Sequence, residues 1–226
     1  MTNSLDTLEL PPKKSSPAAA QGRKAVIDRE DLITAALQLV GPNRSISTLS
    51  LREVARAAGI APNSFYRHFR DMDELAIALI DKAGRSLRAI IGEARQRASR
   101  ERSVIRTSVE SFMEQLCADE ALLHILLREG TVGSNAFKQA VERELRFFEE
   151  ELRADLVRLG EAKNKPLFAP ELAAKGMTRL VFAMGATALD MPRERHAEII
   201  EPTVVMLRMI LIGAETMLKQ PTDSSY

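Results

Sequence analysis

LREVARAAGIAPNSFYRHF, residues 51–69, is the stretch of sequence that decides the fold. Ser50 and Glu53 stand three residues apart at its start, which is the spacing of a capping box at a helix N-terminus. Gly59 permits a sharp backbone turn after that helix, and Pro62 suits the first position of a second helix. The stretch therefore predicts two short helices joined by a glycine turn, as in a helix-turn-helix.

The second helix of this stretch is predicted to bury one face and expose the other. Phe65 and Phe69 lie one turn apart on the apolar face, and we expect the helix to cover 62–70. The remaining side chains are of the types that contact bases and phosphates from a recognition helix. An amphipathic pattern over 28–40 adds a third short helix.

The charge distribution favours a polyanionic partner at this end of the chain. Between Lys13 and Arg70 there are ten basic and four acidic residues, although the net charge of the whole chain is only +1. Chance asymmetry of a solvated surface is the alternative explanation of the charge, and a purely structural helical hairpin is the alternative for the motif. The caps, the turn, the polar face and the basic excess together favour nucleic-acid binding.

The rest of the chain is predicted to be a helical bundle. The absence of Trp, an aromatic content of 4% and the scarcity of alternating apolar patterns argue against an all-β fold. Six further helical segments are expected, at 72–98, 103–117, 119–128, 135–159, 170–189 and 193–219. The predicted fold class is therefore all-α, with three short helices followed by a six-helix bundle.

Composition excludes several functional classes. The 226 residues have an ordinary globular balance, and their apolar runs are too short to span a membrane. A single cysteine, Cys117, excludes an intramolecular disulfide, and with no secretory signal we expect a cytoplasmic protein. His68, His124 and His196 lack the spacing of metal ligands. No phosphate-binding loop or nucleophile motif is recognisable, so we expect no enzyme, no catalytic residue, no metal and no cofactor.

The quoted stretch also resembles a known family. Residues 27–75 are similar to the DNA-binding domain of TetR-family transcriptional repressors, most clearly over 54–69. More narrowly, the chain resembles the FabR- and DesT-type repressors of unsaturated fatty-acid synthesis. That likeness is carried by residues 51–75, 103–109 and 126–129.

The resemblance implies a two-part molecule. Residues 24–70 would form the helix-turn-helix DNA-binding domain, and 71–220 the ligand-binding and dimerisation domain. Residues 1–23 would be a disordered basic tail, and 221–226 a second disordered tail. In this family the last two long helices of each subunit form the dimer interface. The implied partners are a second copy of the chain and double-stranded DNA with a palindromic operator, and no membrane.

The resemblance also assigns the residues that contact DNA. Tyr66 and His68 would lie along the phosphate backbone, and Asn63, Ser64 and Arg67 would face the major groove. The full set is Arg44, Ser50, Leu51, Arg52, Pro62, Asn63, Ser64, Tyr66, Arg67 and His68. Two positions depart from the family pattern: Met72 replaces a frequent lysine, and Ala61 replaces a capping serine.

The implied effector is a long-chain fatty acyl thioester, either acyl-CoA or acyl carrier protein. Arg106 and Arg128 are the bases predicted to lie nearest its headgroup, and a salt bridge to a neighbouring helix is the alternative role for each. The acyl chain is expected to lie among apolar side chains of the bundle, namely Phe112, Met113, Leu116, Leu126, Met177 and Phe182.

Two other functions remain open from the sequence. One is a TetR-type repressor of an efflux operon that senses drugs or other amphiphiles. The other is a helical enzyme that acts on acyl chains, which would require a nucleophile or an acid–base pair inside the bundle.

Overall fold

The computed structural model describes residues 27–40, 44–98, 103–117, 121–132 and 134–217, and the predicted all-α fold is confirmed. These residues form nine α-helices and two 3-10 turns. The helices are α1 (Arg29–Leu39), α2 (Leu51–Ala57), α3 (Pro62–Phe65), α4 (Met72–Ala98), α5 (Val104–Cys117), α6 (Ala121–Val132), α7 (Asn135–Ala162), α8 (Pro170–Leu189) and α9 (Ala197–Met217). The 3-10 turns are η1 (Ile46–Thr48) and η2 (Arg193–Arg195). The tails predicted at 1–23 and 221–226 lie outside the described residues.

The turn between α2 and α3 depends on Gly59. Its φ of 69° places it in the left-handed region, which costs a residue with a Cβ more than it costs glycine. The Ile60 N–H donates to the Ala55 carbonyl at 2.9 Å, and the Gly59 N–H donates to the Arg56 carbonyl at 3.1 Å. This pair of hydrogen bonds is a Schellman motif, which satisfies the last carbonyls of α2. The chain then enters α3 at Pro62, as predicted.

α3 is shorter than the sequence predicted. It was expected to reach Arg70, but the α-helix ends at Phe65. The Arg67 N–H donates to the Ser64 carbonyl at 3.2 Å, and the His68 N–H donates to the Phe65 carbonyl at 3.0 Å. These i→i+3 bonds tighten the chain after Phe65 into turns of 3-10 type. Apolar spacing could not show this difference, because Phe65 and Phe69 are buried in either geometry.

Two other predicted boundaries are corrected. The helix expected to end at Arg128 continues to Val132, because Gly130 is accommodated within α6 rather than breaking it. The last predicted helix, 193–219, is divided: η2 follows Pro192, and α9 begins only at Ala197. The Arg195 N–H donates to the Pro192 carbonyl at 2.9 Å, which is the i→i+3 bond of a 3-10 turn.

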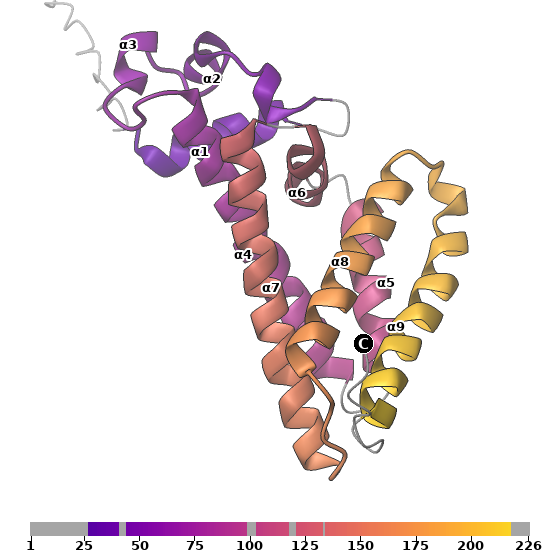
Figure 1. Cartoon of the computed structure of the whole chain (residues 1–226). Helices are drawn as coiled ribbons and strands as arrows, with labels where there is room; N and C mark the ends of the chain where they lie inside the picture. The colour runs from indigo at the N-terminus through magenta and orange to yellow at the C-terminus, as the bar shows by residue number, and fades with distance from the viewer. Residues whose placement is uncertain (1–26, 41–43, 99–102, 118–120, 133, 218–226) are drawn as a thin grey trace, which may run out of the picture.

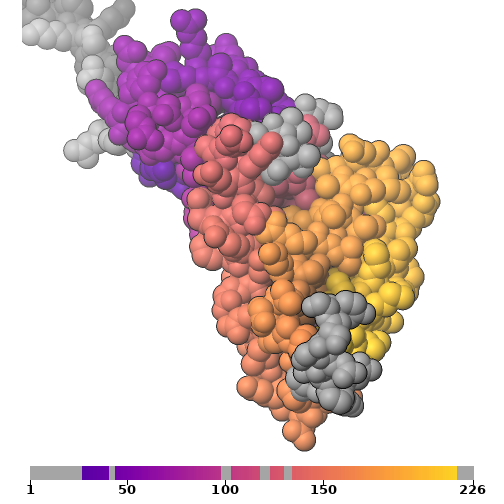
Figure 2. All heavy atoms as spheres, in the orientation of Figure 1, coloured from indigo at the N-terminus to yellow at the C-terminus, as the bar shows by residue number. Residues whose placement is uncertain are grey.

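The long helix α4 joins the two parts of the molecule. Figure 1 shows α1–α3 grouped at one end, with α4 running from that group into the bundle beside α7. Figure 2 shows the same division on the surface, where α8 and α9 lie on the opposite side from the N-terminal helices. One hydrophobic core runs without interruption from Phe65 and Phe69 through Leu79 into the bundle. A displacement of α4 therefore changes the packing both in the N-terminal helices and in the bundle.

Charged side chains join α1 and α7 to α4. At the N-terminal end, the Arg29 guanidinium of α1 lies 3.7 Å from the Glu74 carboxylate of α4. Farther along, Arg88 pairs with Glu144 of α7, whose side chain is only 3% exposed. Gly84 makes room for that carboxylate, since a Cβ at this position would clash with the Glu144 side chain. No helix in the described part of the chain is long and apolar enough to cross a bilayer.

Replacing Gly59 with Ala should destabilise the protein by about 1 kcal/mol, because alanine is strained at positive φ although nothing obstructs its Cβ. Gly59→Asn should cost less, since asparagine tolerates this conformation better. Gly92→Ala in α4 is the matched control, and it should instead stabilise by about 0.5–1 kcal/mol because that glycine is helical. Urea denaturation measures all three. Equal effects of the two alanine substitutions would contradict the role given to Gly59.

Candidate functional site

The helix-turn-helix presents a polar surface supported by buried phenylalanines. Phe65 and Phe69 are at most 1% exposed, and their rings lie 5.7 Å apart. Tyr66 is 60% exposed, although its ring edge meets Phe65 at 5.9 Å. The other predicted contacts on this element are exposed or half-buried: Pro62, Asn63, Ser64, Arg67 and His68. The fold therefore brings them to one short segment that a duplex can approach.

The predicted contacts before α2 are partly engaged within the protein. Ser50 and Glu53 form the predicted capping box, which uses the amide groups of both residues. The first two residues of α2 differ in exposure: Leu51 is half-buried and Arg52 is exposed. Arg44, predicted to contact phosphate, instead donates to Glu53 Oε1 at 2.7 Å. Phosphate contact by Arg44 stays a prediction. It would require the guanidinium to donate to a phosphate and to Glu53 at the same time.

Arg44 and Ser50 also set the protonation of the capping glutamate. The hydrogen bond from the Arg44 guanidinium, followed by those from Ser50, lowers the pKa of Glu53 from 4.5 to about 2. The carboxylate therefore remains charged at any physiological pH, and its charge near the start of α2 is balanced by Arg44. The capping box at the start of α2 is thereby maintained.

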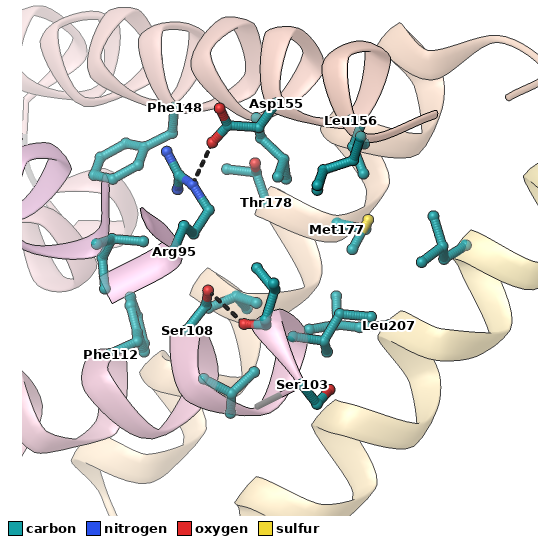
Figure 3. Close-up of a pocket in the computed structure, with 18 of the residues that line it drawn as sticks. Arg95, Ser103, Ser108, Phe112, Phe148, Asp155, Leu156, Met177, Thr178 and Leu207 are labelled. Carbon is teal, nitrogen blue, oxygen red and sulfur yellow. Dashed lines mark hydrogen bonds and ion pairs between the residues drawn. The ribbon is translucent and has the colours of Figure 1, made fainter. Parts of the chain in front are cut away.

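A cavity of about 680 Å³ lies in the bundle between α4, α5, α7, α8 and α9. Figure 3 shows Phe112 and Phe148 in the lining, near the Arg95 side chain. The rings of Phe112 and Phe148 each meet Phe182 edge-on, at 5.5 and 5.3 Å. The apolar lining also includes Ile91, Val109, Leu156, Met177, Val181, Leu207 and Leu211. A volume and lining of this kind are typical of a small-molecule site.

Basic groups outnumber acidic groups in the cavity lining. The described lining contains three bases, Arg95, Arg158 and Lys163, and one acid, Asp155. Figure 3 shows the ion pair in which Arg95 Nε lies 2.7 Å from Asp155 Oδ2. The second oxygen of Asp155 lies 2.6 Å from Arg158. Asp155 thus bridges two arginines, and an anion entering the cavity would compete with it.

The structure brings only some of the residues predicted to contact the effector to this cavity. Phe112, Met177 and Phe182 line the cavity, but Met113, Leu116 and Leu126 are buried in the core outside its lining. Neither Arg106 nor Arg128 is in the lining. Arg106 pairs with Glu201 of α9 and, at 3.6 Å, with Glu110, so its alternative role as a salt bridge is the observed one. The hydrogen bond from Arg106 to Glu201 raises the pKa of the arginine.

Arg95 was missed because the predicted headgroup bases, Arg106 and Arg128, came from the stretches 103–109 and 126–129, which do not include it. It lies one turn after Ile91 on the inner face of α4, and only 12% of its side chain is exposed. Arg88 is equally buried two turns earlier, and Glu144 and Glu151 repeat the same spacing on α7. Matched bases and acids at this spacing indicate two helices joined by ion pairs, and that signal was present in the sequence.

Residues 32–79 match the family model for bacterial regulatory proteins of the tetR family. This part of the chain is therefore similar to the N-terminal segment of tetR-family regulators. The matched segment begins in α1 and ends in α4, so it contains the whole helix-turn-helix. The described lining of the cavity lies beyond the matched segment, since its first residue is Ile91.

Solved structures of similar proteins have the same fold. "E.coli NemR reduced form" matches with a TM-score of 0.60 at 20% identity, covering 81% of this chain and 97% of that one. The fatty acid degradation regulator FadR from Bacillus halodurans matches with a TM-score of 0.60 at 16% identity, covering 80% and 96%. The multidrug binding protein EbrR, complexed with imidazole, matches with a TM-score of 0.62 at 19% identity, covering 81% and 94%. At these identities the matches establish the fold alone.

Arg67→Ala should reduce the specificity of the protein for its DNA sequence. An arginine that contacts a base edge contributes about 1–3 kcal/mol of discrimination, whereas loss of a phosphate contact weakens binding to all sequences alike. Tyr66→Phe should therefore lower affinity uniformly. Competition between a duplex selected by the protein from a random-sequence pool and a scrambled duplex measures both effects.

Arg70→Ala is the control for lost positive charge, because Arg70 is exposed and is not among the residues predicted to face the major groove. It should leave the ratio of selected to scrambled affinity unchanged. An unchanged ratio in Arg67→Ala as well would exclude base contact by Arg67.

Proposed function

We propose that this regulator is a ligand-responsive repressor whose effector is a long-chain fatty acyl thioester, and whose target genes serve unsaturated fatty-acid metabolism. The observation that carries the proposal is the cavity, which combines an apolar side built around Phe112, Phe148 and Phe182 with an excess of basic groups. An amphiphile with an apolar chain and an anionic headgroup fits that division. The thioester would be presented as acyl-CoA or by acyl carrier protein.

The basic side of the cavity is the proposed headgroup position, in place of Arg106 and Arg128. Arg158 and Lys163 are exposed cavity residues at the end of α7, so they can meet the phosphates of a thioester carrier. Arg95 lies deeper and is held by Asp155. An anionic group near Arg95 weakens the Arg95–Asp155 pair, which joins α4 to α7. Binding is thereby linked to the position of α4.

The same helix provides a route to the DNA-binding domain. Leu75 and Leu79 of α4 are fully buried in the continuous core near the N-terminal helices, while Ile91 and Arg95 line the cavity about 18–30 Å farther along the helix. A ligand shifts this equilibrium only if it binds the two arrangements with different affinity. Saturated and unsaturated chains differ in shape, so one chain type should strengthen operator binding and the other should weaken it.

A repressor of an efflux operon is the second candidate function. The Asp155 carboxylate and the phenylalanine faces in the cavity would also suit a cationic amphiphile. Both possibilities have a named structural neighbour, since FadR is described as a fatty acid degradation regulator and EbrR as a multidrug binding protein. The excess of bases in the lining favours the anionic ligand.

Titrating matched saturated and monounsaturated acyl-CoAs into a protein–duplex complex should change DNA affinity in opposite directions. In the double variant Arg158→Gln/Lys163→Gln, acyl-CoA affinity should fall about tenfold because two charge-assisted contacts are lost. Lys165→Gln is the control, since Lys165 is an exposed base close in sequence but outside the cavity lining. Fluorescence anisotropy measures DNA binding, and calorimetry measures the ligand. Equal effects of both chains with a strong response to a cationic drug would favour the efflux function.

The outer faces of α8 and α9 support the further proposal that the regulator is a homodimer. Both helices expose large apolar side chains, namely Leu172, Val205, Met209, Ile212 and Met217. Gly213 faces open space, and the nearest side-chain atom to a Cβ on Gly176 lies 3.9 Å away, so neither position obstructs a second subunit. Each helix is about 30 Å long, which provides enough surface for a stable interface. A two-fold dimer would place its recognition helices on a palindromic operator, about 34–36 Å apart.

Met209→Arg should convert the dimer to a monomer. Met209 is 66% exposed in a single subunit, so the substitution leaves the core intact but places a charge in the proposed interface. Ala154→Arg on the exposed face of α7 is the control and should remain dimeric. Light scattering at micromolar concentration distinguishes the two states. A monomeric wild type would exclude the dimer.

A further inference from the structure

Glu129 is a buried carboxylate at the point where the bundle meets the N-terminal domain. Only 1% of its surface is exposed. It lies in the second half of α6, which Figure 1 shows next to the N-terminal helices. A polar group at this depth is stable only when it is hydrogen-bonded. The partners of Glu129 therefore show which part of the molecule its side chain holds.

Both hydrogen bonds of Glu129 reach across to the N-terminal domain. Its Oε1 accepts from Ser45 Oγ at 2.5 Å and from the Ile46 N–H at 2.9 Å. Ser45 is the N-cap of η1, the 3-10 turn that leads into α2. Among the described residues, Oε2 has no hydrogen-bond partner. One oxygen atom thus makes the whole polar contact, so a shift of about 1 Å in α6 weakens both bonds together.

The contact continues into the helix-turn-helix. Arg44 is adjacent to Ser45 and pairs with Glu53, and Glu53 in turn caps α2 through Ser50. Glu129 holds Ser45 and Ile46, the cap and the first residue of η1. Both therefore belong to the segment that positions the start of α2. Through the Gly59 turn, α2 sets the position of α3.

On its other side, α6 meets a wall of the cavity. A Cβ at Gly185 would lie 2.6 Å from Phe112 and 3.4 Å from Leu127, so these two side chains converge over that glycine of α8. Phe112 lines the cavity, and Leu127 precedes Glu129 by two residues on α6. A ligand that displaces the Phe112 ring would press on α6 close to Glu129.

We propose that Glu129 is a positioning residue for DNA binding: its carboxylate fixes η1, and through η1 the start of α2, and it releases them when a ligand in the cavity displaces α6. The second half of this statement rests on the proposed effector function, whereas the first half rests on the Glu129 contacts alone. Coupling through a hydrogen-bonded element with two positions is a sufficient physical basis, provided that the ligand distinguishes the two positions.

The test compares variants by hydrogen exchange and by DNA binding. Glu129→Leu removes both hydrogen bonds at similar volume, so exchange of the Ile46 amide should accelerate at least about tenfold. Affinity for a duplex selected by the wild type from a random-sequence pool should fall by about the same factor. Glu129→Gln retains an acceptor oxygen, so its affinity should remain within about threefold of the wild type.

Two controls separate this effect from general destabilisation. Leu145→Ala truncates a core residue of α7 outside the cavity, and it should lower global stability without a selective change at Ile46. Ser45→Ala removes one donor to Glu129 together with the cap of η1, and it should weaken DNA binding more than Thr48→Ala, which removes a hydroxyl of the same turn that donates to the Ser45 carbonyl and not to Glu129.

Wild-type DNA affinity and unchanged Ile46 exchange in Glu129→Leu, or in Ser45→Ala if the first variant does not fold, would overturn the proposal. It fails separately from the effector proposal, because the exchange measurement needs neither DNA nor ligand. An acyl-CoA that leaves the wild-type complex unaffected overturns the effector, and unaltered Ile46 exchange overturns the role of Glu129.

Discussion

Because α4 is one unbroken helix, its two ends cannot move independently. It has 27 residues, and it shares the N-terminal core at Leu75 and the cavity wall at Ile91. An α-helix is stiff over this length because each turn is hydrogen-bonded to the next. A displacement of α4 at the cavity therefore also displaces the N-terminal helices, although the two lie in different parts of the molecule. The remaining contacts decide how firmly α4 is held.

Ion pairs between α4 and α7 hold the helix along most of its length. Arg88 and Arg95, two turns apart, face Glu144, Glu151 and Asp155. Removing one member of a buried pair commonly costs about 3–5 kcal/mol, because the other charge is left unpaired in a poorly hydrated place. These pairs therefore fix the register of the two helices. Asp155 differs from Glu144 because it lines the cavity, where a bound anion can take over its role as the partner of Arg95.

The N-terminal domain meets the bundle at two places with different chemistry. Along α4 the contact is apolar and continuous, so it resists displacement over a broad surface. At Glu129 it consists of two hydrogen bonds on a single oxygen, and such bonds are lost over a much shorter displacement. A rigid connection combined with a short-range one is the arrangement expected of a protein with two stable domain positions. In the dimer proposed through α8 and α9, the two bundles would be held together, so that each N-terminal domain would move relative to a fixed bundle.

The helix-turn-helix could be predicted from the sequence because its determinants are local. The capping box of Ser50 and Glu53, the left-handed turn at Gly59 and the entry at Pro62 each act within a few residues. The polar side of the cavity could not, because Arg95 meets Asp155 across 60 positions and Arg106 meets Glu201 across 95. Which face of each bundle helix turns inward depends on packing against helices distant in the sequence, and apolar periodicity does not specify the partner of a charged residue. The sequence alone thus determined the class of fold and the helix-turn-helix. Only the tertiary structure decided that Arg95 lies at the cavity and that Arg106 and Arg128 do not, because the positions of these charges depend on packing between helices that are distant in the sequence.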